Sequence, residues 1–511
     1  MADGATSSKR DLQVAVRNLA KLGGSLGTTL IIGFLIRPLL RRSMDAGAFG
    51  PLDAADGFTA TWCIVLGLGI DAYVRKEIPL RPKHANDFFG STLMLRLLLM
   101  VPITIGMLLT MSVTGRTSDF DELVWLLAAT QFFMALNFTF AALLQSNTTV
   151  TGLSVINVVT KVLWAAGSLV GVRLGYGVEA IAVSMLVSEL IKALVCWWLC
   201  RVHMGLTIAN FGWTPSKVII TATLPYYLNN IFHTVYNKFD VFILSVLAEG
   251  PLGEAGAKQE TAWYGAAAAL GGLSMLVTPL LYGVLMPLLT RARDNDPKEY
   301  DTLVKRSVEL VMVFAIPISL ALGVGAETLL SFMYGPAYAP AALALRLLSP
   351  IYLFIYVSIM SAMVLQIENR AWQLMRISLA GLVLNMVANV VLILPAIHWL
   401  GASGGGAACA TVQIATEGGV AITMLVMMGK RGFDRRTVVM MAKTLAVCAV
   451  VIGVDVALRQ AGVDAARGLV RVLIDAAVYL VLVLVTRAVD PRELTGFMKE
   501  ASRRKREPQV S

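Results

Sequence analysis

Fourteen long apolar runs constrain the fold of this chain more than any other feature of its sequence. Each run is about 20 residues long, the length that an α-helix needs to cross a lipid bilayer. Hydrophobic residues make up 57% of the 511 residues and charged residues only 15%, whereas soluble domains carry about 25% charged residues. We therefore predict an all-α polytopic membrane protein with fourteen transmembrane helices. The predicted spans are residues 22–40, 54–73, 88–112, 123–144, 153–174, 180–200, 218–247, 262–289, 303–324, 341–367, 374–396, 404–428, 438–457 and 469–486.

Short sequence echoes indicate an internal duplication. Glu189 in the sixth span is echoed by Glu417 in the twelfth, and VPITI at 101–105 is echoed by IPISL at 316–320. Both echoes pair a helix with the helix six places later, which predicts a parallel repeat of two pseudo-symmetric six-helix lobes plus two C-terminal helices. The predicted parts are an N-terminal tail (1–21), an N-lobe (22–205), a C-lobe (206–430), helices 13 and 14 (431–490) and a basic tail (491–511).

The basic residues indicate the orientation of the helices. The net charge is +10, but Lys and Arg fall in short blocks between apolar runs, and one side carries about three times as many as the other. This bias places both termini in the cytoplasm. It explains the basic blocks more simply than nucleic-acid binding does, so we expect no nucleic-acid partner. The short N-terminal basic segment lacks a small-residue cleavage site, so we expect an uncleaved first span.

The sequence contains no recognisable catalytic motif. There is no Walker loop, no HExxH and no GxSxG, and the four histidines lack the spacing of metal ligands. All five cysteines lie inside apolar runs, where cysteine behaves as a small hydrophobe. We therefore expect no enzyme activity, no cofactor, no metal and no disulfide.

Ionisable residues inside or beside the spans are the informative ones. Such a residue costs about 2.5–3.5 kcal/mol at a helix centre, so it should face a cavity or a partner. The cations are Arg37, Arg75, Arg96, Lys161, Lys192, Lys238 and Arg291, and the anions are Asp71, Glu189, Asp240, Glu309, Glu417, Asp455 and Asp475.

Several of these residues have two interpretations. Arg37 and Arg96 either face a cavity or extend to the nearest membrane surface, whereas Lys161 lies too deep in its span for that and favours a cavity. Lys192 follows Glu189 by one helical turn, so the two form an ion pair or serve a ligand.

Three segments resemble the polysaccharide transporters of the multidrug, oligosaccharidyl-lipid and polysaccharide (MOP) exporter superfamily. An FG pair at 49–50 followed by LGLGIDAYVRKEI at 66–78 resembles the first helical hairpin of these flippases. TAWYGAAAAL at 261–270, followed by LMPLLTRARD, looks like their eighth helix, and MYGPAYAPAALALRLLSP at 333–350 is similar to the start of their tenth. The resemblance extends over nearly the whole chain.

The resemblance implies a Wzx-type flippase of the bacterial inner membrane. Such a protein moves an undecaprenyl-diphosphate-linked oligosaccharide, the repeat unit of a lipopolysaccharide O-antigen or an exopolysaccharide, to the outer leaflet by alternating access. The two lobes would rock about a central cavity, with helices 13 and 14 outside that core. The implied partners are the lipid-linked oligosaccharide, membrane lipids, a polysaccharide polymerase and a chain-length regulator.

The resemblance also implies roles for particular residues. Helices 1, 2, 7 and 8 of the family border the cavity, and a diphosphate in a membrane must be solvated by fixed positive charge. The implied headgroup ligands are Arg37, Arg75, Lys238 and Arg291, followed by Arg96 and Lys161. The candidates for binding a coupling proton or sodium ion are Asp71, Asp240 and Glu417, among which the sequence gives no preference.

Three other functions remain open at this point. A MurJ-type flippase for lipid II, the peptidoglycan precursor, would also have fourteen helices and a basic cavity. A multidrug/cation antiporter is less favoured, because such proteins normally have twelve helices and acidic cavities. A membrane polysaccharide polymerase or ligase would carry a large functional loop, and no predicted loop exceeds roughly 20 residues.

Overall fold

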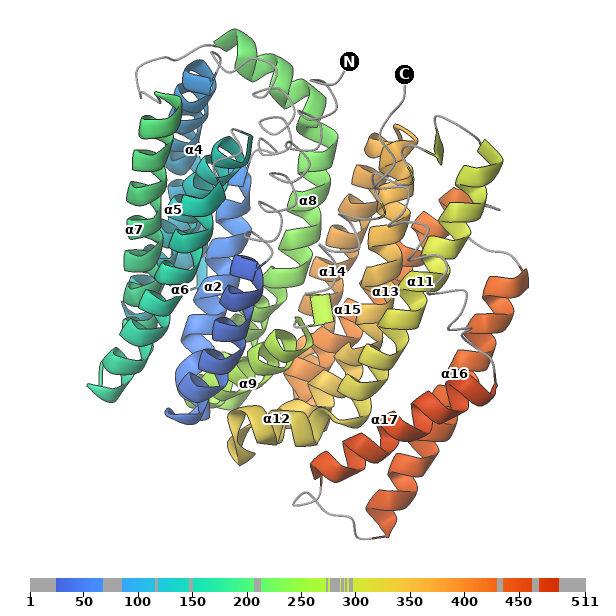
Figure 1. The fold of residues 1–511 in the computed structure, drawn as a ribbon. Coiled ribbons are helices and arrows are strands. Elements are labelled where there is room, and N and C mark those ends of the chain that lie inside the picture. Colours follow the sequence, from blue (N-terminus) through green and yellow to red (C-terminus); the bar gives the residue numbers. More distant parts are fainter. Residues whose placement is uncertain are drawn as a thin grey trace. The chain divides into compact units, whose positions relative to one another are not determined.

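The structure is a computed structural model, and the elements that it describes are helical (Figure 1). The described residues are 24–67, 85–114, 118–146, 150–205, 213–272, 274–275, 285, 289, 292–293, 297–429, 435–461 and 468–486. Contacts divide the chain into two compact units. Unit 1 comprises Met1–Glu249 and Glu254–Ala262, and unit 2 comprises Gly250–Gly253 and Trp263–Ser511. Helix α9 (Glu249–Gly272) contributes residues to both units, and its backbone kinks at Gly253, where φ is 71°.

Unit 1 is built from a helix at 24–42 and the elements that follow it as far as α9. These are η1 (Ala46–Ala48), α2 (Phe49–Cys63), η2 (Ile64–Gly67), α4 (Ala85–Thr114), α5 (Ser118–Ser146), α6 (Val150–Arg173), α7 (Glu179–Met204) and α8 (Trp213–Leu247). Helix α2 packs against α5 and α8, and α7 packs against α5 and α6. Phe58 of α2 fixes the first of these contacts, with its ring 4.6 Å from that of Phe242 on α8 and 6.1 Å from that of Phe120 on α5.

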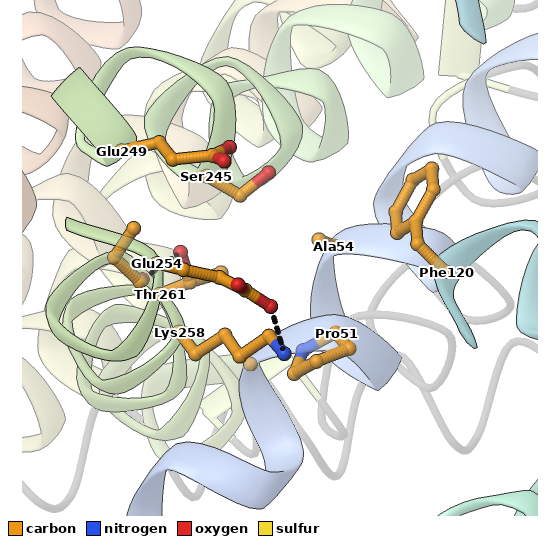
Figure 2. Close-up of a pocket in the computed structure, with 10 residues that line it drawn as sticks. Pro51, Ala54, Phe120, Ser245, Glu249, Glu254, Lys258 and Thr261 are labelled. Atoms are coloured by element: carbon orange, nitrogen blue, oxygen red, sulfur yellow. Dashed lines mark hydrogen bonds and ion pairs between the residues drawn. The ribbon is translucent and has the colours of Figure 1, made fainter. Parts of the chain in front are cut away.

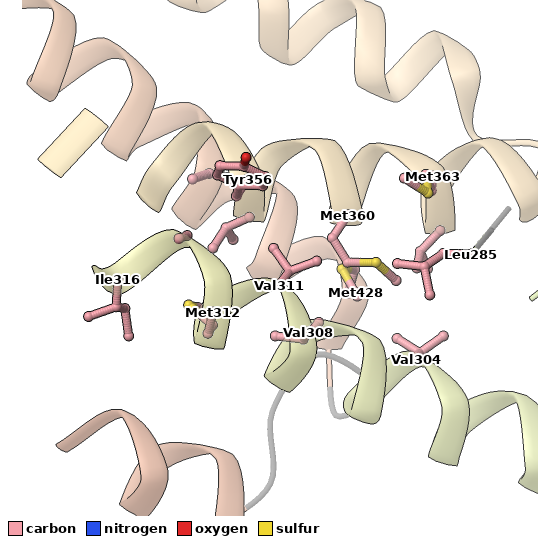
Figure 3. Packing of buried hydrophobic residues seen from close by; sticks show 14 of the residues in the cluster. Leu285, Val304, Val308, Val311, Met312, Ile316, Tyr356, Met360, Met363 and Met428 are labelled. Atoms are coloured by element: carbon pink, nitrogen blue, oxygen red, sulfur yellow. The ribbon is translucent and has the colours of Figure 1, made fainter. Parts of the chain in front are cut away.

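Unit 2 is built around α13. Its elements after α9 are α11 (Pro297–Val324), α12 (Ala326–Tyr334), η5 (Pro336–Tyr338), α13 (Ala341–Ile367), α14 (Ala371–Leu400), α15 (Gly404–Met428), α16 (Arg435–Gln460) and α17 (Gly468–Val485). Helix α13 packs against α11 and α15, and α14 packs against α15. Figure 3 shows the apolar side chains of α11, among them Val304 and Val311, packed against Met360 and Tyr356 of α13.

The same packing pattern occurs in each unit. In unit 1 α7 contacts α5 and α6, and in unit 2 α15 contacts α13 and α14. These helices correspond to predicted spans 4 to 6 and 10 to 12, so the recurrence agrees with the predicted six-helix offset. Helix α8 falls in unit 1, whereas the predicted C-lobe begins at residue 206. The division into lobes at 205 and 430 stays a prediction.

Nine helical segments of the described residues are long and apolar enough to cross a membrane, and the predicted total of fourteen is not confirmed. The nine are Phe89–Val113, Phe120–Gln145, Thr151–Arg173, Glu179–Met204, Tyr300–Val324, Ala341–Ile367, Ala371–Leu400, Gly404–Met428 and Val439–Leu458. Many large apolar side chains on them are exposed, such as Leu109 and Val387, as expected for surfaces that face lipid.

Two local features differ from what the sequence indicates. A Gly-Pro pair such as Gly50-Pro51 is typical of a turn, but both residues lie in the first turn of α2. Proline is tolerated there because the first N–H groups of a helix have no acceptor within it. The segment between spans 9 and 10 contains the short helix α12, which we did not predict.

Candidate functional site

Two acidic residues of α2 form ion pairs with cations of other helices in unit 1. Asp53 and Asp56 are one helical turn apart, so they lie on the same side of α2. Arg41, in the last turn of helix 24–42, is the cationic partner of Asp53, and Lys238 of α8 is the cationic partner of Asp56. We call Arg37, Arg41, Asp53, Asp56 and Lys238 the charged cluster. Only Arg37 and Lys238 of these were predicted as site residues.

Arg41 and Asp53 form an ion pair in which the arginine side chain is buried and the aspartate side chain is 22% exposed. Both terminal oxygens of Asp53 accept hydrogen bonds from Nη2 of Arg41, at 2.8 and 2.7 Å. Nη1 of Arg41 donates to the backbone oxygen of Ala262 on α9, at 3.3 Å, and the guanidinium lies over the ring of Phe49. Arg41 lies in the last turn of helix 24–42, where the helix dipole favours a positive charge. The pair therefore joins helix 24–42, α2 and α9.

Asp56 and Lys238 form a looser pair between α2 and α8. The Lys238 Nζ atom is 3.7 Å from Oδ2 of Asp56, and the two side chains are 51% and 40% exposed. The neighbouring residue Gly57 permits this arrangement, because a Cβ atom there would lie 2.5 Å from the backbone oxygen of Lys238. The close approach of the two backbones places the side chain of Lys238 beside Asp56.

Lys161 adds a further cation near Arg37 of this cluster. Arg37 precedes Arg41 by one turn on the same side of helix 24–42, and its side chain is exposed. Its charge acts on both Asp53 and Lys161. The Lys161 Nζ atom on α6 lies over the ring of Trp164, 4.0 Å from its centroid, and its Cε atom packs near Gly33. Lys161 thus lies against helix 24–42.

Glu189 binds Asn137, and not Lys192 as considered from the sequence. Its Oε2 atom accepts a hydrogen bond from Nδ2 of Asn137 on α5, at 2.7 Å, and its backbone oxygen accepts a second one. Within the part of the chain that the structure describes, Glu189 makes no ion pair with Lys192. The pairing of these two residues along α7 is therefore not formed.

The other described candidates for headgroup binding or ion coupling are buried. Arg96 is 1% exposed and donates from Nε to the backbone oxygen of Leu66, at 2.8 Å, so its side chain is packed inside unit 1. Asp240 is 1% exposed, and its Oδ1 accepts from the backbone N–H of Val241. Glu417 is fully buried on α15 in unit 2. The remaining candidates, Asp71, Arg75 and Arg291, lie outside the described residues.

A small pocket lies at the start of α2 (Figure 2). The acidic and basic residues that line it are Glu249, Glu254 and Lys258. Nζ of Lys258 is 2.7 Å from Oε1 of Glu254, and the hydrogen bond from Lys258 lowers the pKa of Glu254. The volume of about 30 Å³ accommodates water but no lipid headgroup.

Comparison with known proteins decides the family. The sequence profile of a family described as polysaccharide biosynthesis protein matches residues 39–343, more than half of the chain. The chain belongs to this family. The match includes most of the charged cluster and extends into α13, so the resemblance to the polysaccharide branch of the MOP superfamily is confirmed.

One curated relative of this polysaccharide biosynthesis protein is named a probable low-salt glycan biosynthesis flippase, from Haloferax volcanii. The two are 22% identical over 246 residues, which are 47% of this chain and 48% of the relative. The chain thus matches about half the length of that relative.

Solved structures identify the fold. An inward-facing multidrug resistance MATE transporter of the MOP superfamily superposes with a TM-score of 0.60, at 17% identity, over 79% of this chain and 94% of the other. A MOP superfamily transporter from Pyrococcus furiosus, described as having a binding pocket of reverse polarity, gives a TM-score of 0.56 at 15% identity, over 81% of this chain and 96% of the other. The polysaccharide biosynthesis protein therefore has the fold of the MOP transporters, and the predicted fold class is confirmed apart from the number of helices.

Proposed function

We propose that this protein is a flippase for an oligosaccharide that is linked to a lipid through a diphosphate. Membership of a polysaccharide biosynthesis family supports a glycan substrate. The transporter fold and the flippase name of the curated relative support movement of that glycan across a membrane, and favour a transporter over an enzyme.

The observation that carries the proposal is the exposure of two cations that belong to the charged cluster around α2. Arg37 and Lys238 are both exposed, although they lie in segments predicted to cross the membrane. An exposed cation at such a position is costly unless water or an anionic ligand solvates it. A diphosphate between a lipid and a sugar is an anion that such cations would bind.

The finer parts of the proposal are those that the family resemblance and the distribution of basic residues imply. The substrate is an undecaprenyl-diphosphate-linked repeat unit of an O-antigen or exopolysaccharide, carried across the bacterial inner membrane by alternating access of two lobes. Both termini lie in the cytoplasm, and a polymerase and a chain-length regulator receive the product. Arg75, Arg291 and Lys161 add positive charge to the site, and Arg96 supports it from within unit 1. Ion coupling belongs to Asp71, Asp240 or Glu417.

Complementation tests the proposed function. The protein is expressed in a bacterial strain that lacks its O-antigen flippase, with surface glycan as the readout, and in a strain depleted of its lipid II flippase, with survival as the readout. We expect surface glycan without rescue of survival. Survival without glycan would assign the protein to the peptidoglycan precursor, and failure of both despite expression in the membrane would contradict the proposal.

A further inference from the structure

The two aspartates of α2 hold their cations in contrasting ways. Asp53 binds Arg41 through two hydrogen bonds, and the Arg41 side chain is only 6% exposed. Asp56 approaches Lys238 at 3.7 Å, with both side chains about half exposed. A pair with a buried arginine that donates two hydrogen bonds is costly to break, whereas an exposed single contact contributes about 0–1 kcal/mol. The first pair therefore fixes structure, and the second pair is easily opened.

We propose that Asp56 is the resident counter-ion of Lys238, which the diphosphate of the substrate displaces when it binds. This inference rests on the proposed function and adds a residue that sets the affinity of the same site. Asp56 holds the ammonium of Lys238 while the site is empty. When the substrate binds, its phosphate oxygens replace the carboxylate beside the ammonium. When the substrate leaves, the ion pair between Asp56 and Lys238 forms again.

The packing around Lys238 allows this exchange without movement of a helix. Gly57 brings the backbone of α8 against α2, with its Cβ position 2.5 Å from the Lys238 carbonyl oxygen. The backbone of Lys238 is thus held in place, and only the side-chain torsions have to change. A lysine ammonium is a compact charge on four rotatable carbons, so it can change partners by changing rotamers.

The exchange also solves a problem of release. A cation that binds a diphosphate without any competitor would release it slowly, since binding that is equally strong before and after movement does not speed the cycle. An adjacent carboxylate lowers the net affinity and stabilises the empty site. Asp56 therefore lowers the affinity of the site for the diphosphate and speeds its release in each transport cycle.

Binding of farnesyl diphosphate to the purified full-length protein in detergent tests the inference. Replacing Asp56 by Asn removes the competitor, so we expect the affinity to rise about 2- to 5-fold, the factor that corresponds to an exposed ion pair. The flipping rate in liposomes should fall. Asp56→Glu keeps a carboxylate beside Lys238, so its affinity should stay below that of Asp56→Asn. Asp56→Ser is the second neutral variant, for use if the asparagine variant does not fold.

Two controls test whether a gain in affinity arises from release of Lys238 by Asp56 or from the loss of one negative charge. Glu254→Gln removes one negative charge from another exposed pair of unit 1, and should leave the affinity unchanged. In a Lys238→Gln background, the gain from Asp56→Asn should disappear. A gain that persists there would show simple repulsion of the ligand by Asp56 and would overturn the inference.

The outcomes also separate this inference from the proposed function. If the wild type binds farnesyl diphosphate but the neutral Asp56 variants bind it equally or more weakly, the exchange is wrong and the flippase proposal stands. If the wild type shows no binding at all, both are overturned.

Discussion

The backbone oxygen of Lys238 lies so close to Gly57 that no larger residue fits between α2 and α8. Helix α8 is thereby held against the part of α2 that carries Asp56. The position of a candidate substrate-binding lysine thus depends on a glycine of another helix. This relationship leads to the first prediction.

Replacing Gly57 by Val should destabilise unit 1 by about 1–3 kcal/mol, because the added side chain overpacks the contact between α2 and α8. Thermal unfolding of the purified protein in detergent measures the loss. Gly27→Ala is the matched control, because a Cβ at Gly27 meets nothing within 4 Å and alanine favours a helix by about 1 kcal/mol. Equal melting temperatures for the Gly57 variant and the wild type would contradict the close packing.

Replacing Asp53 by Asn should lower stability by about 3–5 kcal/mol, because Arg41 then keeps a buried charge without its counter-ion. The fall in melting temperature and in yield of folded protein measures the effect. Replacing both members of the pair, as in Arg41→Met with Asp53→Leu, should recover most of the stability. If the double variant is less stable than Asp53→Asn, the Arg41–Asp53 pair makes a net contribution to stability, and the unpaired charge of Arg41 is not the main cause of the loss.

Neutralising Arg37 and Lys238 together should abolish transport while the protein still folds. The two side chains are exposed, so their loss removes little packing but removes the fixed charge for the substrate diphosphate. Restoration of surface glycan in the complementing strain gives the readout, and membrane expression gives the check on folding. The matched control is Lys258→Gln with Arg346→Gln, which also removes two cations, each from a partly exposed ion pair. Transport that survives the first double variant would exclude these residues from the site.

Much of the fold could be predicted from the sequence because apolar runs and helix-ending signals are local. The predicted spans 341–367 and 404–428 coincide with α13 and α15. Pro340 precedes the first of these helices, and Gly429 follows the second with φ of 62°, a conformation that glycine adopts readily. The start of α9 was missed by thirteen residues, because the segment from Glu249 to Thr261 is helical without being apolar.

The candidate site was predicted less completely because its partners come from different helices. The sequence analysis does not name Arg41, Asp53 or Asp56 as candidates. Asp53 precedes the second predicted span, which begins at residue 54, and Asp56 lies in the first turn of that span. A sequence signal existed: two aspartates one turn apart at the edge of an apolar run, with a basic cluster ahead of them. Which cation each aspartate would bind depends on tertiary contacts that spacing does not fix. Arg96 was expected to face a cavity or extend to the membrane surface, and its bond to Leu66 likewise arises from packing.

Flipping of a labelled lipid in liposomes tests the central claim most directly. The full-length protein is reconstituted with a polyprenyl-diphosphate-linked oligosaccharide that carries a fluorophore on its sugar, and a reducing agent outside the liposomes destroys the fluorophores of the outer leaflet. We predict that the wild type makes the inner-leaflet lipid accessible to the reducing agent, and that the variant lacking Arg37 and Lys238 does not. Equal loss of fluorescence with both proteins, or with neither, would contradict a flippase that binds the diphosphate through this charged cluster.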